Sequence, residues 1–134
     1  MNILLDTHIL LWAMLDSSSL SAKAREIILQ NYHLLHYSVV SVWEIAIEHK
    51  LHPENLLSSG QDVVNLCHEA NLRSLPLKSE HIVAFENLSR NDDAPSHKDP
   101  FDQILISQAI AEKMIFVTHD KTLRYYSDVN IQLV

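Results

Sequence analysis

Four acidic residues lie where a carboxylate is unfavourable unless a positive charge meets it. Two follow short apolar runs typical of buried strands, and two lie within apolar helical patterns; in that order they are Asp6, Asp120, Glu44 and Asp102. Converging carboxylates repel each other by about 1 to 4 kcal/mol per pair at ~4 Å, depending on the dielectric. A divalent cation that prefers oxygen ligands, Mg²⁺ or Mn²⁺, would remove this repulsion. The chemistry that such a centre suggests is hydrolysis of phosphodiesters by an activated water.

Helix capping is the alternative explanation for each of these acids. Asp6 and Asp120 could each cap a helix that follows. Glu44 could complete a capping box with Ser41, and Asp102 could interact with a helix dipole as the third residue of its helix. Each explanation is sufficient for one residue, but four such acids in one chain favour a shared site.

The helix predicted from Pro100 to about Lys113 has the clearest sequence signals. Asp99 is expected to cap it, with Pro100 in its first position. Capping accounts for Asp99, and an indirect role at the metal site is its alternative. Apolar residues follow Asp102 at helical spacing, which places its carboxylate at the head of the buried face: Leu105, Ile106, Ala109 and Ile110.

Short apolar segments alternate with helical ones along the chain. We expect strands at 2–5, 34–39, 73–77, 115–117 and 130–133, helices at 22–30, 42–50, 61–70, 80–88, 100–113 and 121–126, and a loop at 89–98. Ser41 and Ser79 are the expected caps of the second and fourth helices. The alternation favours an α/β fold with a mostly parallel sheet, in which ligands bind beyond the carboxyl ends of the strands. Asp6 and Asp120 would both lie at that edge.

The composition excludes several kinds of site. A chain of 134 residues that is 47% apolar suits one domain, residues 1–134. The single glycine, Gly60, excludes glycine-rich phosphate loops, and the net charge of −7 argues against a broad basic surface for nucleic acid. No apolar run approaches the ~20 residues of a membrane span, and the first residues lack the basic start of a signal peptide. The one cysteine, Cys67, is expected in the core of a cytoplasmic protein.

The sequence resembles PIN-domain proteins, in particular the VapC-type toxins of bacterial toxin–antitoxin pairs. The resemblance covers nearly the whole chain and is carried by four ordered segments: LLDTHILLW (4–12), SVWEIAIEHKL (41–51), HKDPFDQILISQA (97–109) and FVTHD (116–120). It implies a PIN-like three-layer sandwich, whose central, mostly parallel sheet is flanked by helices. The acidic quartet of the family maps onto Asp6, Glu44, Asp102 and Asp120.

The resemblance also implies an activity and partners. The expected protein is an endoribonuclease that uses Mg²⁺ or Mn²⁺ and acts on tRNA or other structured RNA, as the toxin of a pair. Asp6, Asp102 and Asp120 would hold the cation, with Glu44 bound directly or through water. A cognate antitoxin would restrain the enzyme, which would form a homodimer. Leu11, Trp12 and Leu15 form a candidate wall of the antitoxin groove, or else pack in the core.

Other residues beside the acids are candidates for supporting roles. Thr7, Ser41 and Thr118 match the family pattern and could hold water or orient carboxylates. Lys98 would face phosphate or solvent, and His119 could touch substrate or be an ordinary surface histidine. Two further histidines, His8 and His97, are near the acids in sequence, but no His-x₃-His or Cys-x₂-Cys spacing favours zinc.

Two departures from the family pattern affect substrate choice, and three alternatives stay open. The subgroup usually has arginine where this chain has Lys98 and Gln103. The loss of these arginines weakens bidentate phosphate binding. The loop 89–96 looks longer and more acidic than usual.

The alternatives are a PIN nuclease of RNA processing, a catalytically silent PIN module that binds protein, and an aspartyl-phosphate phosphatase. A phosphatase would have a second Asp where this chain has His8.

Overall fold

The computed structural model describes residues 1–54 and 58–134. Its strands are β1 (Ile3–Leu5), β2 (Leu35–Ser38), β3 (Arg73–Leu75), β4 (Ile115–Thr118) and β5 (Asn130–Leu133). They form one sheet in the order β3-β2-β1-β4-β5, and all neighbouring strands run parallel. In the centre, Ile3 of β1 lies opposite Leu35 of β2 and Ile115 of β4. The predicted α/β class and parallel sheet are confirmed.

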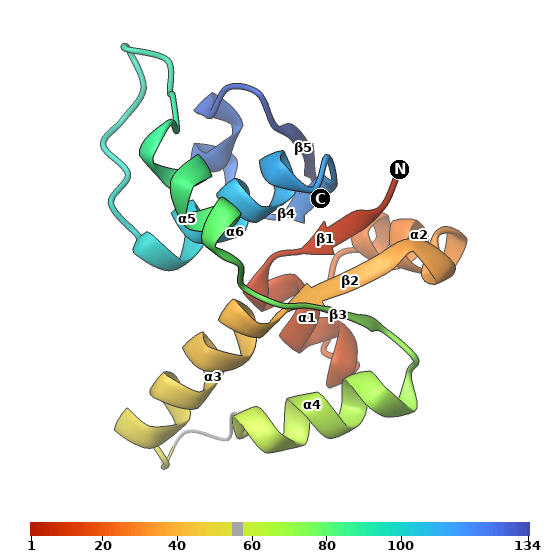
Figure 1. The fold of residues 1–134 in the computed structure, drawn as a ribbon. Coiled ribbons are helices and arrows are strands. Elements are labelled where there is room, and N and C mark those ends of the chain that lie inside the picture. The colour runs from red at the N-terminus through yellow and green to blue at the C-terminus, as the bar shows by residue number, and fades with distance from the viewer. Residues whose placement is uncertain (55–57) are drawn as a thin grey trace.

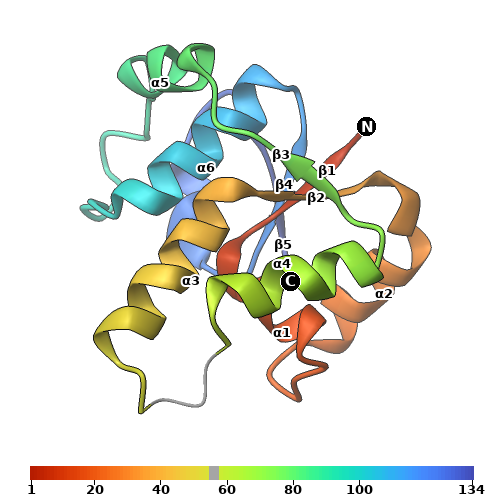
Figure 2. The same ribbon diagram turned by 60° about the horizontal axis from the view of Figure 1, so that its bottom comes forward.

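Helices cover both faces of this sheet. They are α1 (Thr7–Met14), α2 (Ala22–Gln30), α3 (Val39–Leu51), α4 (Gly60–Glu69), α5 (Ser79–Glu86) and α6 (Pro100–Ala111), with short 3₁₀ helices η1 (Tyr32–Leu34) and η2 (Lys121–Tyr125). Figures 1 and 2 show α1, α2 and α4 on one side of the sheet and α5 and α6 on the other. This is the three-layer sandwich that the resemblance to PIN-domain proteins implied.

The alternation of side chains along β1 divides the core between these two layers. Ile3 and Leu5 pack with apolar residues of α1, α2 and α4, whereas Leu4 packs with Leu105 and Ile106 of α6. Successive strand residues point to opposite faces, so a sheet covered by helices on both sides needs apolar residues at every position. The helix α3 contacts α1, α4 and α6 and thus joins the layers.

Two predicted helix caps are wrong. The helix α3 begins at Val39, and its cap is Ser38, whose Oγ accepts a hydrogen bond from the Val40 N–H. Because β2 passes into α3 without a loop, the last strand residue is the cap, and Ser41 is buried inside the helix. Ser79 is the first residue of α5 and not its cap.

The remaining elements differ little from the prediction. Asp99 caps α6 and Pro100 opens it, as expected. Residues 89–98 form the expected loop, within which Arg90 makes an isolated antiparallel bridge to Tyr126. The bounds of α1 could not be predicted, because its sequence is apolar almost throughout and has no polar face to set the helical period. Within the described ranges, no helix has both the length and the apolar character needed to cross a bilayer.

Candidate metal centre

Asp6 lies where the central strand β1 and its neighbour β4 end. Its backbone N–H donates to the Val117 carbonyl of β4 (2.9 Å), and only 3% of the residue is exposed. Its carboxylate accepts hydrogen bonds from the Thr7 N–H at Oδ1 (2.8 Å) and from the Thr118 hydroxyl at Oδ2 (2.6 Å). Burial raises the pKa of Asp6, although both hydrogen bonds act to lower it. Asp6 therefore caps α1 and is also a buried carboxylate at the edge of the sheet.

The helix α3 brings Glu44 next to α1. The Thr7 hydroxyl donates to Glu44 Oε1 (2.7 Å) and lies 2.9 Å from Ser41 Oγ. Because a hydroxyl carries one proton, Ser41 donates to Thr7 while Thr7 donates to Glu44. Burial raises the pKa of Glu44, the Thr7 hydrogen bond opposes this, and the carboxylates of Asp99 and Asp6 raise it further. The capping box proposed for Ser41 and Glu44 is wrong, since α3 begins two residues before Ser41.

The carboxylate of Asp102 is close enough to the other acids of the site for their charges to shift its pKa. Its pKa is raised to about 8, first by burial and then by four carboxylates around it: Asp6, Asp99, Glu44 and Asp120. These come from the end of β1, the start of α6, the middle of α3 and the segment after β4. The four acids identified from sequence, together with Asp99, thus share one electrostatic environment.

Asp120 combines capping with a position at the site. Its Oδ1 accepts hydrogen bonds from the Thr122 N–H (2.9 Å) and the Thr122 hydroxyl (2.7 Å), which makes it the cap of η2. Burial acts to raise its pKa, but the two bonds from Thr122 help to lower it overall. One ligand atom from each of His97, Asp102 and Asp120 lies within 4.8 Å of the others. Capping and metal binding are therefore compatible roles for the same residue.

The acids fit a divalent cation because the chain supplies little positive charge to them. In residues 1–54 and 58–134, no Lys or Arg forms an ion pair with any of the five acids of the site: Asp6, Glu44, Asp99, Asp102 and Asp120. Within these residues, the only basic side chain that pairs with one of them is His97, whose Nε2 lies 3.2 Å from Asp102 Oδ2. Oxygen donors that repel one another and lack their own cation are the ligand set that Mg²⁺ or Mn²⁺ takes.

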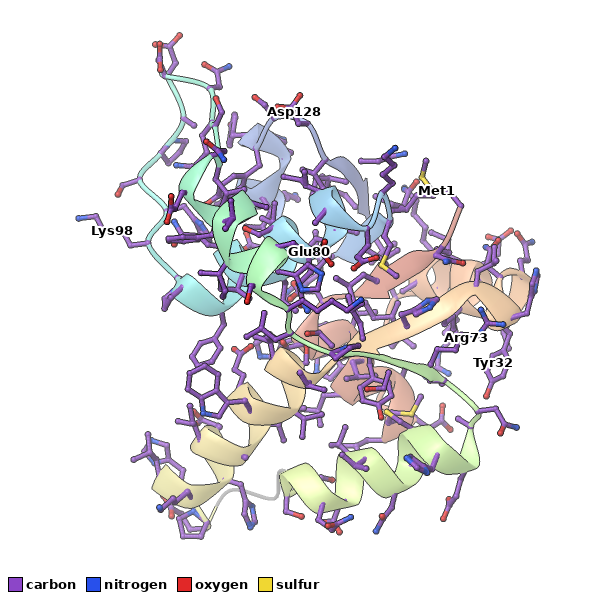
Figure 3. The ribbon with its side chains drawn as sticks, viewed as in Figure 1. Met1, Tyr32, Arg73, Glu80, Lys98 and Asp128 are labelled. Carbon is purple, nitrogen blue, oxygen red and sulfur yellow. The ribbon has the colours of Figure 1, made fainter. Side chains whose placement is uncertain are left out.

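The remaining candidates lie at different distances from the acids. His119 is exposed, and its ring packs against those of Trp12 and His8 beside Asp6 and Asp120. Lys98 is exposed on the loop before α6 and projects away from the body of the molecule (Figure 3). Of the predicted groove wall, Leu11 lines a cavity of about 280 Å³ together with Thr7, His8, Glu44, Ile45 and Glu48. Trp12 instead packs partly against the core.

Two residues that contact the site were not identified from the sequence as its members. His97 contacts Asp102, and Tyr126 contacts His97 through its hydroxyl (2.6 Å). The only sequence signal for His97 was its place five residues before Asp102, and Tyr126 had none.

Several solved structures have the same fold as this chain. VapBC2 from Rickettsia felis, bound to a DNA fragment from their promoter, contains a chain that is 12% identical with a TM-score of 0.71; the match covers 99% of this chain and 98% of that one. DNA-bound VapBC from Salmonella typhimurium contains a chain that is 12% identical, with a TM-score of 0.69. That match covers 98% of this chain and 97% of the Salmonella chain. FitAcB from Neisseria gonorrhoeae contains a chain that is 15% identical, with a TM-score of 0.59. That match covers 96% of this chain and 95% of the Neisseria chain. No curated protein gives a significant match.

The similarity in fold extends over nearly the whole length of each matched chain, so these chains and this one share one architecture. A sequence model of the PIN domain matches residues 3–129, which run from the start of β1 to the residue before β5. This range includes every acid of the site described above. The chain is therefore a member of the PIN domain family.

Proposed function

We propose that this chain is a metal-dependent endoribonuclease and the toxin of a toxin–antitoxin pair. PIN domains are generally nucleases. The observation that carries the proposal is that ligand atoms of Asp102 and Asp120 lie within 4.8 Å of each other, while no Lys or Arg in residues 1–54 and 58–134 forms an ion pair with either acid. The repulsion between such carboxylates destabilises the folded chain, and a bound cation would remove it.

In this proposal, Asp6, Asp102 and Asp120 hold Mg²⁺ or Mn²⁺, with Glu44 bound directly or through water. The cation, when bound, activates a water for attack on phosphorus and stabilises the charge on the leaving 3′-oxygen. Asp6 is held rigidly because Thr7 and Thr118 each bond one of its oxygens. Because Thr7 holds one oxygen of Glu44, the other oxygen can accept the proton that the attacking water loses when Glu44 is bound through water and not directly. Its raised pKa makes it a stronger base than an ordinary carboxylate.

The proposed substrate is an unpaired stretch of RNA, such as a loop of tRNA. Beside the acids, the His119 ring lies 4.9 Å from the Trp12 ring and 5.7 Å from the His8 ring, between centroids. Unpaired bases stack on aromatic and imidazole rings, whereas the bases of a duplex are not free to do so. We therefore assign base stacking to this cluster of three rings, and contact with phosphate to Lys98.

The proposed protein partner is an antitoxin, and the similar structures are VapBC and FitAB complexes. A largely apolar groove of about 430 Å³ lies between α1, α2 and α4, with Met14, Leu20, Leu29 and Leu66 among its lining residues. An amphipathic helix of the antitoxin would fit this groove. Co-purification with the product of the neighbouring reading frame tests the pairing, and light scattering tests the expected homodimer. A cytoplasmic location belongs to the same proposal.

The decisive experiment compares Asp6→Asn and Asp102→Asn with the unaltered protein in RNA cleavage with Mg²⁺ or Mn²⁺. Both substitutions remove a charge with little change in volume, and we expect a loss of cleavage of at least about 100-fold. Asp16→Asn is the matched control, because Asp16 is exposed and pairs only with Arg25 on the surface. Sequencing of RNA ends after induction identifies the target. Unchanged cleavage by both variants would refute the proposal.

A further inference from the structure

We propose that His97 adds a nitrogen ligand to the cation that Asp6, Asp102 and Asp120 hold, with Tyr126 as the residue that positions the imidazole. This inference rests on the proposed function, since it concerns the same cation. It departs from the all-oxygen centre that the acids alone suggest.

The position of His97 carries the first part of the inference. Its side chain is only 9% exposed, and its Nε2 lies 3.2 Å from Asp102 Oδ2. Ligand atoms of His97, Asp102 and Asp120 lie within 4.8 Å of one another. Three atoms that are equally spaced around one cation, at about 2.2 Å from it, lie about 3.8 Å apart. Inward movements of at most about 0.6 Å are therefore enough for all three to bind one ion.

The other ring nitrogen is held in the way that a ligand histidine requires. His97 Nδ1 lies 2.6 Å from the Tyr126 hydroxyl, and the two rings meet edge to face at 5.5 Å. A histidine that binds a metal usually donates its second N–H to a neighbouring group, which fixes the tautomer and the plane of the ring. If Nδ1 donates to Tyr126, the lone pair of Nε2 faces Asp102.

Tyr126 is itself fixed from behind. It is 5% exposed, and the guanidinium of Arg90 lies 5.0 Å from the centre of its ring. The attraction between a cation and the face of an aromatic ring, together with burial, limits rotation of the ring. A chain of contacts thus runs from Arg90 through Tyr126 and His97 to Asp102, although the first and last of these belong to different segments of the chain.

The neighbouring histidines provide a contrast. His8 and His119 are exposed and pack against Trp12 and each other. Among the described residues, neither joins Asp, Glu or Cys side chains in a group close enough to bind one cation. Imidazole binds transition metals more readily than Mg²⁺, which takes oxygen ligands. The inference therefore predicts that the site prefers Mn²⁺ to Mg²⁺ because of His97.

Pulsed electron paramagnetic resonance of the Mn²⁺-loaded protein tests this directly, because it detects ¹⁴N bound to the ion. We expect a nitrogen coupling in the unaltered protein and in His119→Ala, the matched control, and none in His97→Ala or His97→Gln. Tyr126→Phe should keep the coupling but bind Mn²⁺ about 10-fold or more weakly, as expected when the group that orients a ligand is lost. Circular dichroism shows whether each variant is folded, and the glutamine variant replaces the alanine variant if the latter is not.

The outcomes separate this inference from the proposed function. If Mn²⁺ binds the unaltered protein without a nitrogen coupling, or if the coupling persists without the imidazole of His97, the inference is wrong and the nuclease proposal stands. If Mn²⁺ does not bind the unaltered protein at all, both fail. A Mn²⁺ preference over Mg²⁺, measured by calorimetry, should fall at least about 10-fold in His97→Gln.

Discussion

The carboxyl group of Asp102 shows most clearly what the centre does to a single residue. Its pKa rises from 3.8 to about 8 because burial and four neighbouring carboxylates disfavour its charged form. In the metal-free protein, the folded state therefore keeps a proton that the unfolded chain loses near pH 4. Between these two values the folded state binds more protons, so its stability falls as the pH rises.

Asp102→Asn should remove this pH dependence. In EDTA, we expect the variant to be more stable than the unaltered protein at pH 8, by roughly 1 to 3 kcal/mol, and about equally stable at pH 4. The amide N–H of the variant can donate to His97 Nε2, as the protonated carboxyl of Asp102 does, so the difference reports the charge. Urea unfolding at both pH values measures it. The same difference at pH 4 and pH 8 would contradict the electrostatic explanation.

Trp12 allows the stacking assignment to be tested one residue at a time. The chain has two tryptophans, so Trp43→Phe leaves Trp12 as the only one and keeps an aromatic ring against Phe101. Single-stranded RNA, added with EDTA to prevent cleavage, should quench Trp12 fluorescence, and duplex RNA of the same length should not. His119→Ala should weaken binding by about 1 kcal/mol or more. Equal quenching by both RNAs would exclude stacking of an unpaired base.

At the scale of the elements, the centre depends on β1 and β4 ending side by side. Leu5 pairs with Val117 in the parallel ladder, so the next residues of both strands emerge at the same edge. The Thr118 hydroxyl then bonds Asp6 across the two strands, although 112 positions separate these residues. The same hydroxyl accepts a hydrogen bond from the Asp120 N–H (3.1 Å), so one buried threonine orients two acids.

Thr118→Val should therefore destabilise the protein more than its small change in shape suggests. The substitution leaves buried Asp6 Oδ2 without its donor, which typically costs about 1–3 kcal/mol. Thr118→Ser, which keeps the hydroxyl, is the control and should recover most of that loss. Denaturant unfolding measures both variants in EDTA. A valine variant as stable as the serine variant would show that the hydroxyl does not support Asp6.

At the scale of the whole molecule, the cation would join parts of the chain that otherwise repel one another. Its proposed ligands come from the end of β1, from α3, from α6 and from the segment after β4. No single element can bind the ion, so binding requires the folded arrangement. A ligand that binds only the folded state stabilises it by mass action.

Mn²⁺ should accordingly raise the melting temperature. At a free concentration about 100 times its Kd, the gain is ~2.7 kcal/mol, which corresponds to roughly 10 °C for a chain of this length. Asp6→Asn and Asp102→Asn should lose most of this shift, and Asp16→Asn should keep it. Potassium chloride at the same ionic strength serves as the control for screening of charge. Equal shifts with both salts would mean that no specific cation site exists.

The sequence determined the local features of this protein, because they depend on residues a few positions apart. Apolar runs defined β1, β2 and β4, and Asp99 with Pro100 defined the start of α6. The positions of the four acids were also evident, since carboxylates stand out after apolar strands. The predicted cap of α3 was wrong because two serines, Ser38 and Ser41, are both suitable caps. Only the direct passage from β2 into α3 selects Ser38.

Tertiary structure decided which of these groups meet. Thr7 bonds Glu44 across 37 positions, and His97 meets Tyr126 across 29. Such pairs depend on the order β3-β2-β1-β4-β5 and on the way each helix packs on the sheet, which no local pattern encodes. The same long-range packing produces the pKa of Asp102, because a carboxylate acquires its charge environment from neighbours in space and not from neighbours in sequence.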